Sequence, residues 1–174
     1  FLTVKEIRQL QKGTLELFDL AKDPEVSIEI DPRVTSNEQL EVLRELGFNR
    51  VSLGVQDFEK AVQQAINREQ SFEQTEEMLR YCRSLGYRGI NFDLIYGLPF
   101  QTVETFEKTI DSVLRVRPDR IALYNYAHLP HLLAHQKILD TKERPEADQR
   151  LEIFSKAFEK LTMNGYRTVG MDHF

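Results

Sequence analysis

Short apolar runs rich in β-branched residues recur along the chain, and each ends on polar residues next to a turn marked by proline or glycine. These runs cover residues 26–32, 50–57, 89–99, 121–130 and 166–173. Patterns typical of amphipathic helices separate them. Strands that alternate with helices favour right-handed βαβ connections and a parallel sheet. The sequence therefore predicts an α/β fold with about five parallel strands.

The segments between the runs carry apolar residues at helical spacing, together with residues that start and stop helices. The expected helices cover residues 4–20, 36–46, part of 57–70, 72–85, 103–116, part of 129–142, and 147–163. Thr3 and Glu6 form a capping pattern for the first helix, whereas Gly47 and the pair Asn164 and Gly165 end two others. No linker or low-complexity tract divides the chain, so we expect one domain.

Polar or charged residues near the ends of the runs are candidates for a binding site. Because ligands bind at the carboxyl ends of parallel strands, Glu29, Gln56, Asp93, Ala127 and Asp172 are expected to lie around one shared edge. Glu29 and Asp93 interrupt otherwise apolar strands, where a charge is costly unless it is paired or bound to a ligand. A polar layer inside a barrel is the alternative interpretation.

Arg68 follows the second run on an irregular segment. Its planar guanidinium can hold a carboxylate through two hydrogen bonds, although an exposed arginine between acidic residues can equally be solvated. His128, His131 and His135 have a spacing that suggests metal ligands, but a proline between them argues against one helix that presents all three. Cys82 lies in a helical pattern and is expected in the core.

The composition argues against nucleic-acid and membrane partners. The net charge is −5 and the isoelectric point is about 5.5, which gives no broad attraction to polyanions. No apolar run approaches the roughly 18 residues of a spanning helix. The single cysteine excludes an internal disulfide and agrees with a reducing compartment. We therefore expect a cytoplasmic protein.

The chain contains six ordered segments with a recognisable pattern, at residues 28–33, 54–58, 67–70, 93–99, 125–130 and 170–174. Together they resemble the oxygen-independent coproporphyrinogen III oxidase (dehydrogenase) family, radical S-adenosylmethionine (SAM) enzymes of bacterial haem biosynthesis. Each alone is weakly specific, but six in order at compatible spacing span nearly the whole chain.

The resemblance implies a partial (β/α)6 TIM-like barrel of which residues 1–174 are the central part. A full eight-unit barrel needs about 250 residues, and we expect further residues before Phe1 and after Phe174. Family members use a [4Fe-4S] cluster and SAM to generate a 5'-deoxyadenosyl radical, with an electron donor. The radical removes hydrogen from two propionates of coproporphyrinogen III, and loss of carbon dioxide leaves the vinyl groups of protoporphyrinogen IX.

The same resemblance assigns residues to SAM. Glu29 falls on a contact to the reactive molecule, and Gln56, Arg68, Asp93 and Ala127 fall on contacts to a second, adjacent molecule. No catalytic residue is assigned.

The family's cluster cysteines have no counterpart in this chain, because Cys82 alone cannot hold a cluster that needs several thiolates. We expect the ligands, and a C-terminal domain, outside these residues, so the chain alone should be inactive. Its open sheet edges favour self-association, whereas the whole protein is expected to be a monomer.

Positive groups are needed to hold the anionic substrate on an acidic protein. Arg33, His128 and His131 are therefore hypothesised to receive its propionates.

Two other functions fit parts of the pattern. A related radical SAM protein carries haem instead of making its precursor, although residues 30–33, 67–70 and 125–128 resemble the oxidase more closely. Alternatively, a barrel enzyme without a cluster can use Glu29 and Asp93 as acid and base.

Overall fold

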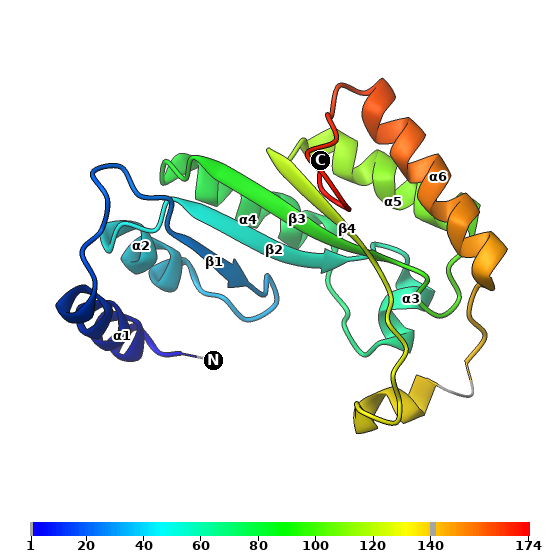
Figure 1. Ribbon diagram of the computed structural model, residues 1–174, viewed down its shortest axis with the longest axis horizontal. Helices are drawn as coiled ribbons and strands as arrows, with labels where there is room; N and C mark the ends of the chain where they lie inside the picture. Colours follow the sequence, from blue (N-terminus) through cyan, green and yellow to red (C-terminus); the bar gives the residue numbers. More distant parts are fainter. Residues whose placement is uncertain (1, 140–141) are drawn as a thin grey trace.

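The computed structural model describes residues 2–139 and 142–174, in which four strands alternate with helices (Figure 1). The strands are β1 (Ser27–Ile30), β2 (Arg50–Gln56), β3 (Gly89–Tyr96) and β4 (Arg120–Asn125). They form one sheet in the order β1-β2-β3-β4, and every neighbouring pair is parallel. The predicted alternating α/β architecture is confirmed.

The helices follow the predicted segments closely. They are α1 (Val4–Leu17), α2 (Asn37–Glu45), α3 (Lys60–Ala65), α4 (Phe72–Ser84), α5 (Val103–Val116), the 3-10 helix η1 (Ala134–Leu139) and α6 (Ala147–Met163). Thr3 and Glu6 form the predicted capping box, but α1 ends earlier than expected because Phe18 adopts extended backbone. None of the described helices is long and apolar enough to cross a membrane.

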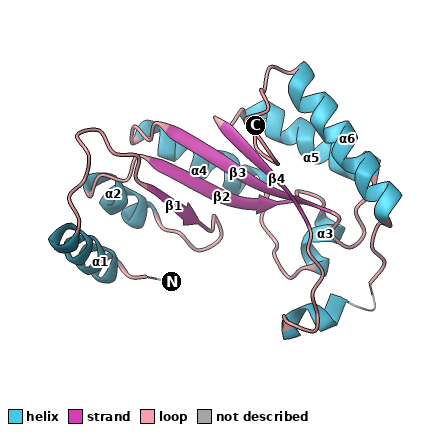
Figure 2. Ribbon diagram, in the orientation of Figure 1, coloured by secondary structure: helices cyan, strands magenta, loops and turns pink. Residues whose placement is uncertain are grey.

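Helices α2, α4, α5 and α6 cover one face of the sheet (Figure 2). Alternate strand residues, such as Leu53 and Phe92, are fully buried and pack with Leu79 of α4, Phe106 of α5 and Ile153 of α6. Burial of one such side chain stabilises the fold by about 1.5–3 kcal/mol. Since strand side chains alternate between faces, the polar residues between them lie on the opposite, uncovered face.

The strand expected over residues 166–173 is not formed, so the described residues contain four of the about five parallel strands expected. The backbone φ angles of Gly170 and Met171 are 143° and 49°, and these residues turn the chain back on itself. His173 then forms isolated antiparallel bridges to Ala122 and Gly170. The β-branched residues in this segment therefore do not form a parallel strand, because the turn reverses the direction of the chain.

The carboxyl ends of the strands point toward α3 and η1 (Figure 1). Both elements are short, as predicted for residues 57–70 and 129–142. They stand beyond the sheet edge together with the loops that follow each strand. This rim is the position at which parallel α/β folds bind ligands.

Candidate functional site

A polar cluster occupies the middle of the uncovered face. The parallel register pairs Glu29 with Ser52, Ser52 with Asn91, and Gly54 with Asp93. Asn91 Nδ2 donates to Ser52 Oγ at 2.7 Å and to Asp93 Oδ1 at 2.8 Å, and Ser52 Oγ donates to Asp93 Oδ2 at 2.6 Å. The polar layer considered as an alternative is therefore present, and Asp93 belongs to it.

Asp93 does not lie at the strand end where the sequence placed it, because β3 continues to Tyr96. Burial raises the pKa of Asp93, the hydrogen bonds from Ser52 and Asn91 oppose that rise, and the negative charge of Glu29 adds to it. Two carboxyl groups thus interact across one face of the sheet. Such a pair is suited to a cationic ligand group, such as an ammonium or sulfonium.

Arg68 lies above this cluster, on the loop after α3. Its Nη1 is 3.3 Å from Asp31 Oδ2, and its Nη2 donates to the carbonyl oxygen of Gly54 at 2.9 Å. Its Nε is buried and has no hydrogen-bond partner among the described residues. Burial lowers the pKa of Arg68, and the charge of Asp31 opposes this shift. The guanidinium therefore keeps donor capacity for a carboxylate.

Arg33 shares Asp31 with Arg68. Arg33 Nε is 3.0 Å from Asp31 Oδ1, and Arg33 Nη2 is 2.7 Å from Asp31 Oδ2. The hydrogen bond from Arg33 is the main cause of a lowered pKa at Asp31. Two arginines around one carboxylate leave an excess positive charge at the rim. Because the Arg33 guanidinium is already engaged, its suggested contact with substrate stays a prediction.

Gln56 and Arg68 line one cavity of about 420 Å³, together with Tyr126. The rest of its wall is mostly apolar and includes Ala65, Ile66, Ile95, Leu98, Ile138 and Leu139. At Gly54, an added Cβ would lie 2.7 Å from Arg68 Nη2 and 2.9 Å from Gln56 Nε2. Glycine thus allows both polar groups to approach the strand. A cavity with apolar walls and a few polar groups fits a small organic ligand with a carboxylate.

Asp57 anchors a second polar network that the sequence did not reveal. Its side chain is 0% exposed, and its two carboxylate oxygens accept from Thr109 Oγ1 at 2.6 Å and Gln101 Nε2 at 2.5 Å. Gln101 Oε1 accepts from the backbone N–H groups of Gly97 and Leu98. Burial raises the pKa of Asp57, and the hydrogen bonds oppose that rise. The network ties the loop after β3 to the end of β2.

The remaining predicted residues are more dispersed. Glu29 is exposed and lines a separate hollow of about 260 Å³ with Ile28 and Ile30. The carbonyl oxygen of Ala127 accepts from Gln136 Nε2 at 3.0 Å, and Ala127 does not line the cavity of Gln56 and Arg68. Asp172 is half-buried; burial raises the pKa of Tyr96 and Tyr124, and the charge of Asp172 adds to that rise.

The histidines do not form a metal centre in the part of the chain that the structure describes. His128 Nδ1 is 3.3 Å from the Tyr126 hydroxyl, and His131 is exposed; the side chain of His135 lies outside the described residues. No group of three potential metal ligands occurs among the described residues. Cys82 is buried, and burial raises its pKa to about 12, so it is a core residue as predicted.

Comparisons with known proteins place this geometry in a family. The model of the Radical SAM superfamily matches residues 3–113. Oxygen-independent coproporphyrinogen III oxidase from Pseudomonas aeruginosa is 45% identical over 176 residues, which cover 100% of this chain and 38% of that protein. The enzyme of the same name from Thermostichus vulcanus is 46% identical over 157 residues, covering 90% of this chain and 48% of that protein.

A solved structure of coproporphyrinogen III oxidase from Escherichia coli, described as a radical SAM enzyme, is also similar. It matches with a TM-score of 0.95 at 44% identity, over 99% of this chain and 40% of that one. The chain thus spans about two fifths of the length of this relative. Because the family model covers more than half of its residues, the chain belongs to the Radical SAM superfamily.

Proposed function

We propose that the whole protein containing this chain is an oxygen-independent coproporphyrinogen III oxidase of haem biosynthesis. It would convert two propionates of coproporphyrinogen III to the vinyl groups of protoporphyrinogen IX. Residues 1–174 are then the central part of its barrel. The observation that carries the proposal is the cavity of Gln56 and Arg68, on a backbone that matches the E. coli enzyme with a TM-score of 0.95.

SAM and a [4Fe-4S] cluster are the cofactors that membership of the superfamily implies. When bound, they supply the radical that removes hydrogen from the substrate. The cavity fits one part of this set, since its mostly apolar wall suits a nucleoside and Arg68 lines it with a cationic guanidinium that can bind a carboxylate. The cluster does not fit this chain alone, because its only cysteine is buried in the core. We propose that the cluster cysteines lie upstream, in another part of the whole protein.

Two SAM molecules are proposed, each held by its own group of residues. Arg68 would bind the carboxylate of the second SAM molecule. Gln56 would form hydrogen bonds with polar groups of the same molecule, and Asp93 would bind its ammonium group or its ribose hydroxyls. The backbone of Ala127 would contact the adenine. Glu29 would bind the ammonium of the reactive molecule.

The other partners follow from the same proposal. Coproporphyrinogen III is the substrate, an electron donor is required, and neither nucleic acid nor membrane takes part. Arg33, His128 and His131 remain candidates for contacts with the propionates. We propose that the whole protein is cytoplasmic and monomeric, and that this chain alone is inactive and self-associates through its sheet edges.

Anaerobic assay of the whole protein, with SAM and a reductant, tests this function. Two vinyl groups formed per coproporphyrinogen III, with release of carbon dioxide, would support the oxidase. Stoichiometric binding of haem without turnover would instead identify the related haem carrier. Turnover that survives removal of iron and sulfide would favour acid and base chemistry by Glu29 and Asp93.

A further inference from the structure

A second cavity, of about 480 Å³, lies at the rim between the end of β3, the segment after β4 and the start of α6. It shares Tyr126 with the cavity of Gln56 and Arg68, so the two are neighbours. Unlike that cavity, its wall contains several charged side chains. The cations are Lys142, Arg144 and Arg150. None of these three residues is among those proposed above to bind SAM.

The aliphatic stem of Arg150 packs against Gly97, and its guanidinium forms no ion pair with the described residues. A Cβ at Gly97 would lie 2.9 Å from Arg150 Cδ, so the glycine makes room for this side chain. Gly97 also has a backbone φ of +87°, which disfavours other residues. Arg150 Nε is buried without a hydrogen-bond partner among the described residues. The side chain is thus pre-positioned with unused donors.

The location of Arg150 increases the positive potential of the cavity. Arg150 stands near the amino-terminal end of α6, which begins at Ala147. Positive charge is unfavourable there, because the helix dipole places partial positive charge at that end. Arg150 occupies this position without an ion-pair partner among residues 2–139 and 142–174, and an anionic ligand would explain it. Ordinary surface stabilisation would favour an acidic residue.

Among the basic residues that line the cavity, the two arginines are the candidates for binding a ligand, because the lysine already has a hydrogen-bond partner. Lys142 Nζ donates to the carbonyl oxygen of Ala65 at 2.6 Å and is thereby occupied. Arg144 is half-buried, and the described residues provide no ion pair for it. Glu143 and Glu146 also line the wall, so Lys142, Arg144 and Arg150 exceed the acidic residues by one positive charge. A carboxylate is an anion that a planar guanidinium can bind through two hydrogen bonds.

We propose that Arg150 and Arg144 bind a propionate carboxylate of the tetrapyrrole substrate. This inference rests on the proposed oxidase function, from which it takes the identity of the ligand. The macrocycle would lie across the rim above β3 and β4, and one propionate would enter the cavity beside Tyr126. Arg150 and Arg144 are then substrate-binding residues that neither the sequence patterns nor the family resemblance had indicated.

Equilibrium binding of coproporphyrin III to the whole protein tests the proposal. This aromatic tetracarboxylate carries the same four propionates as the substrate, and its fluorescence reports binding. We expect R150Q to weaken binding about tenfold, because a charge-assisted bidentate contact is lost. R150K, which keeps the charge, should lose less, and R144Q should also weaken binding. The affinity of wild type should fall with salt more steeply than that of R150Q.

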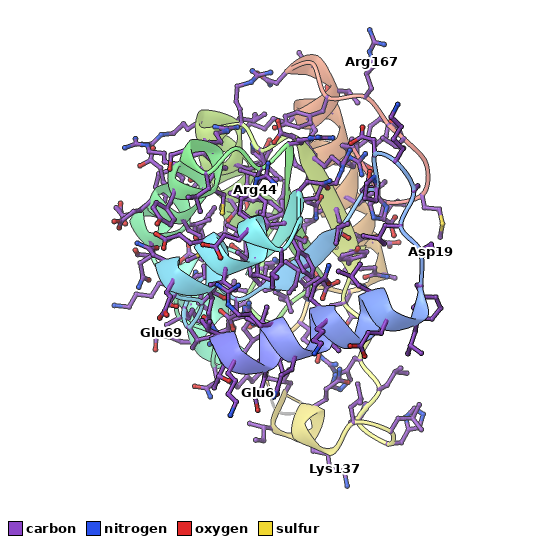
Figure 3. The ribbon with its side chains drawn as sticks, turned by 90° about the vertical axis from the view of Figure 1, so that its left-hand side faces the viewer. Glu6, Asp19, Arg44, Glu69, Lys137 and Arg167 are labelled. Carbon is purple, nitrogen blue, oxygen red and sulfur yellow. The ribbon has the colours of Figure 1, made fainter. Side chains whose placement is uncertain are left out.

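R167Q is the matched control. Arg167 projects into solvent from the C-terminal segment (Figure 3), so the same change of charge should leave porphyrin binding unaltered. SAM binding, measured on the same variants by calorimetry, should be unchanged in R150Q and R144Q. A loss of SAM affinity in place of porphyrin affinity would overturn the proposal and assign the cavity to the SAM carboxylate.

Two further outcomes separate this proposal from the proposed function. If wild type binds and converts its substrate while R150Q and R144Q bind coproporphyrin III as tightly as wild type, the arginine site is wrong and the oxidase function stands. If wild type neither binds coproporphyrin III nor forms vinyl groups, the proposed function fails and the site loses its ligand. R144Q keeps the test decisive if R150Q does not fold.

Discussion

Two polar clusters at the same rim differ in how completely their groups are satisfied. Asp57 is sealed from solvent, and both of its oxygens meet donors from Thr109 and Gln101. Arg68 borders a cavity, and its Nε meets none among the described residues. Since buried polar groups in proteins are usually hydrogen-bonded, the first cluster is suited to holding loops and the second to binding a ligand.

The two clusters begin at consecutive residues. Gln56 has a left-handed backbone, with φ of +66°, at an irregularity in the pairing of β2 with β3. Gln56 therefore lines the cavity while Asp57 is buried beside α5. A left-handed backbone conformation at Gln56 thus separates a residue that lines a cavity from one that is buried in a hydrogen-bond network. This teaches that neighbours in sequence can have opposite roles when the chain is bent between them.

The largest expected effect is a loss of stability when the Asp57 cluster is disrupted. D57A should destabilise the protein by about 3 kcal/mol, because the donors of Thr109 and Gln101 lose a buried acceptor. Urea unfolding of the whole protein, followed by circular dichroism, measures this. T109V, which removes one donor, should cost about 1 kcal/mol. A D57A variant as stable as wild type would show that the network does not hold the loops.

A substitution beside Arg68 and Gln56 should weaken SAM binding with little change in the free energy of unfolding. G54A would push the Arg68 and Gln56 side chains away from the strand, because its Cβ would approach their nitrogens within 3.0 Å. We expect SAM binding to weaken about tenfold at the affected site, measured by calorimetry. G13A is the control, since a Cβ on Gly13 meets nothing within 4 Å and alanine favours its helix. Equal effects of both variants would contradict the account.

The pH dependence of stability should reveal the carboxyl cluster on the uncovered face. Burial raises the folded-state pKa of Asp93 above its unfolded value of about 3.9. Its contribution is therefore fully present below the unfolded pKa and is lost as pH rises through the folded pKa. Relative to D93N, wild type should lose stability as pH rises from about 3 to 7. Urea unfolding at several pH values checks this, and an opposite slope would refute the burial of Asp93.

The smallest expected effect concerns Cys82. Because burial raises the pKa of its thiol to about 12, the thiolate is nearly absent at pH 8. Iodoacetamide should leave this residue unmodified in the native protein and modify it in urea, as mass spectrometry of the corresponding peptide can show. Rapid native modification would place Cys82 in an accessible site instead of the core.

The sequence predicted the elements best where local signals were complete. The bounds of α5 and α6 were correct, because capping residues precede each helix and Pro118 or Gly165 follows it. The strand expected over residues 166–173 failed because the positive φ angles of Gly170 and Met171 override its β-branched pattern. Local propensity could not show that turn.

The candidate site was predicted only in part. Gln56 and Arg68 do line one cavity, but Asp93 lies deeper in the sheet and Arg33 is paired with Asp31. The Asp57 network escaped prediction because its partners are 44 and 52 residues away along the chain. Such contacts depend on tertiary packing, which no spacing rule within one sequence describes.

The number of SAM molecules bound by the whole, cluster-containing protein tests the central claim most directly. Isothermal titration calorimetry should give two SAM sites for wild type. R68A should keep one site, because it removes the guanidinium from the cavity. E29Q should also keep one site, because it loses the carboxylate of the other site. Two sites of unchanged affinity in R68A would contradict the assignment of the Gln56 and Arg68 cavity to SAM.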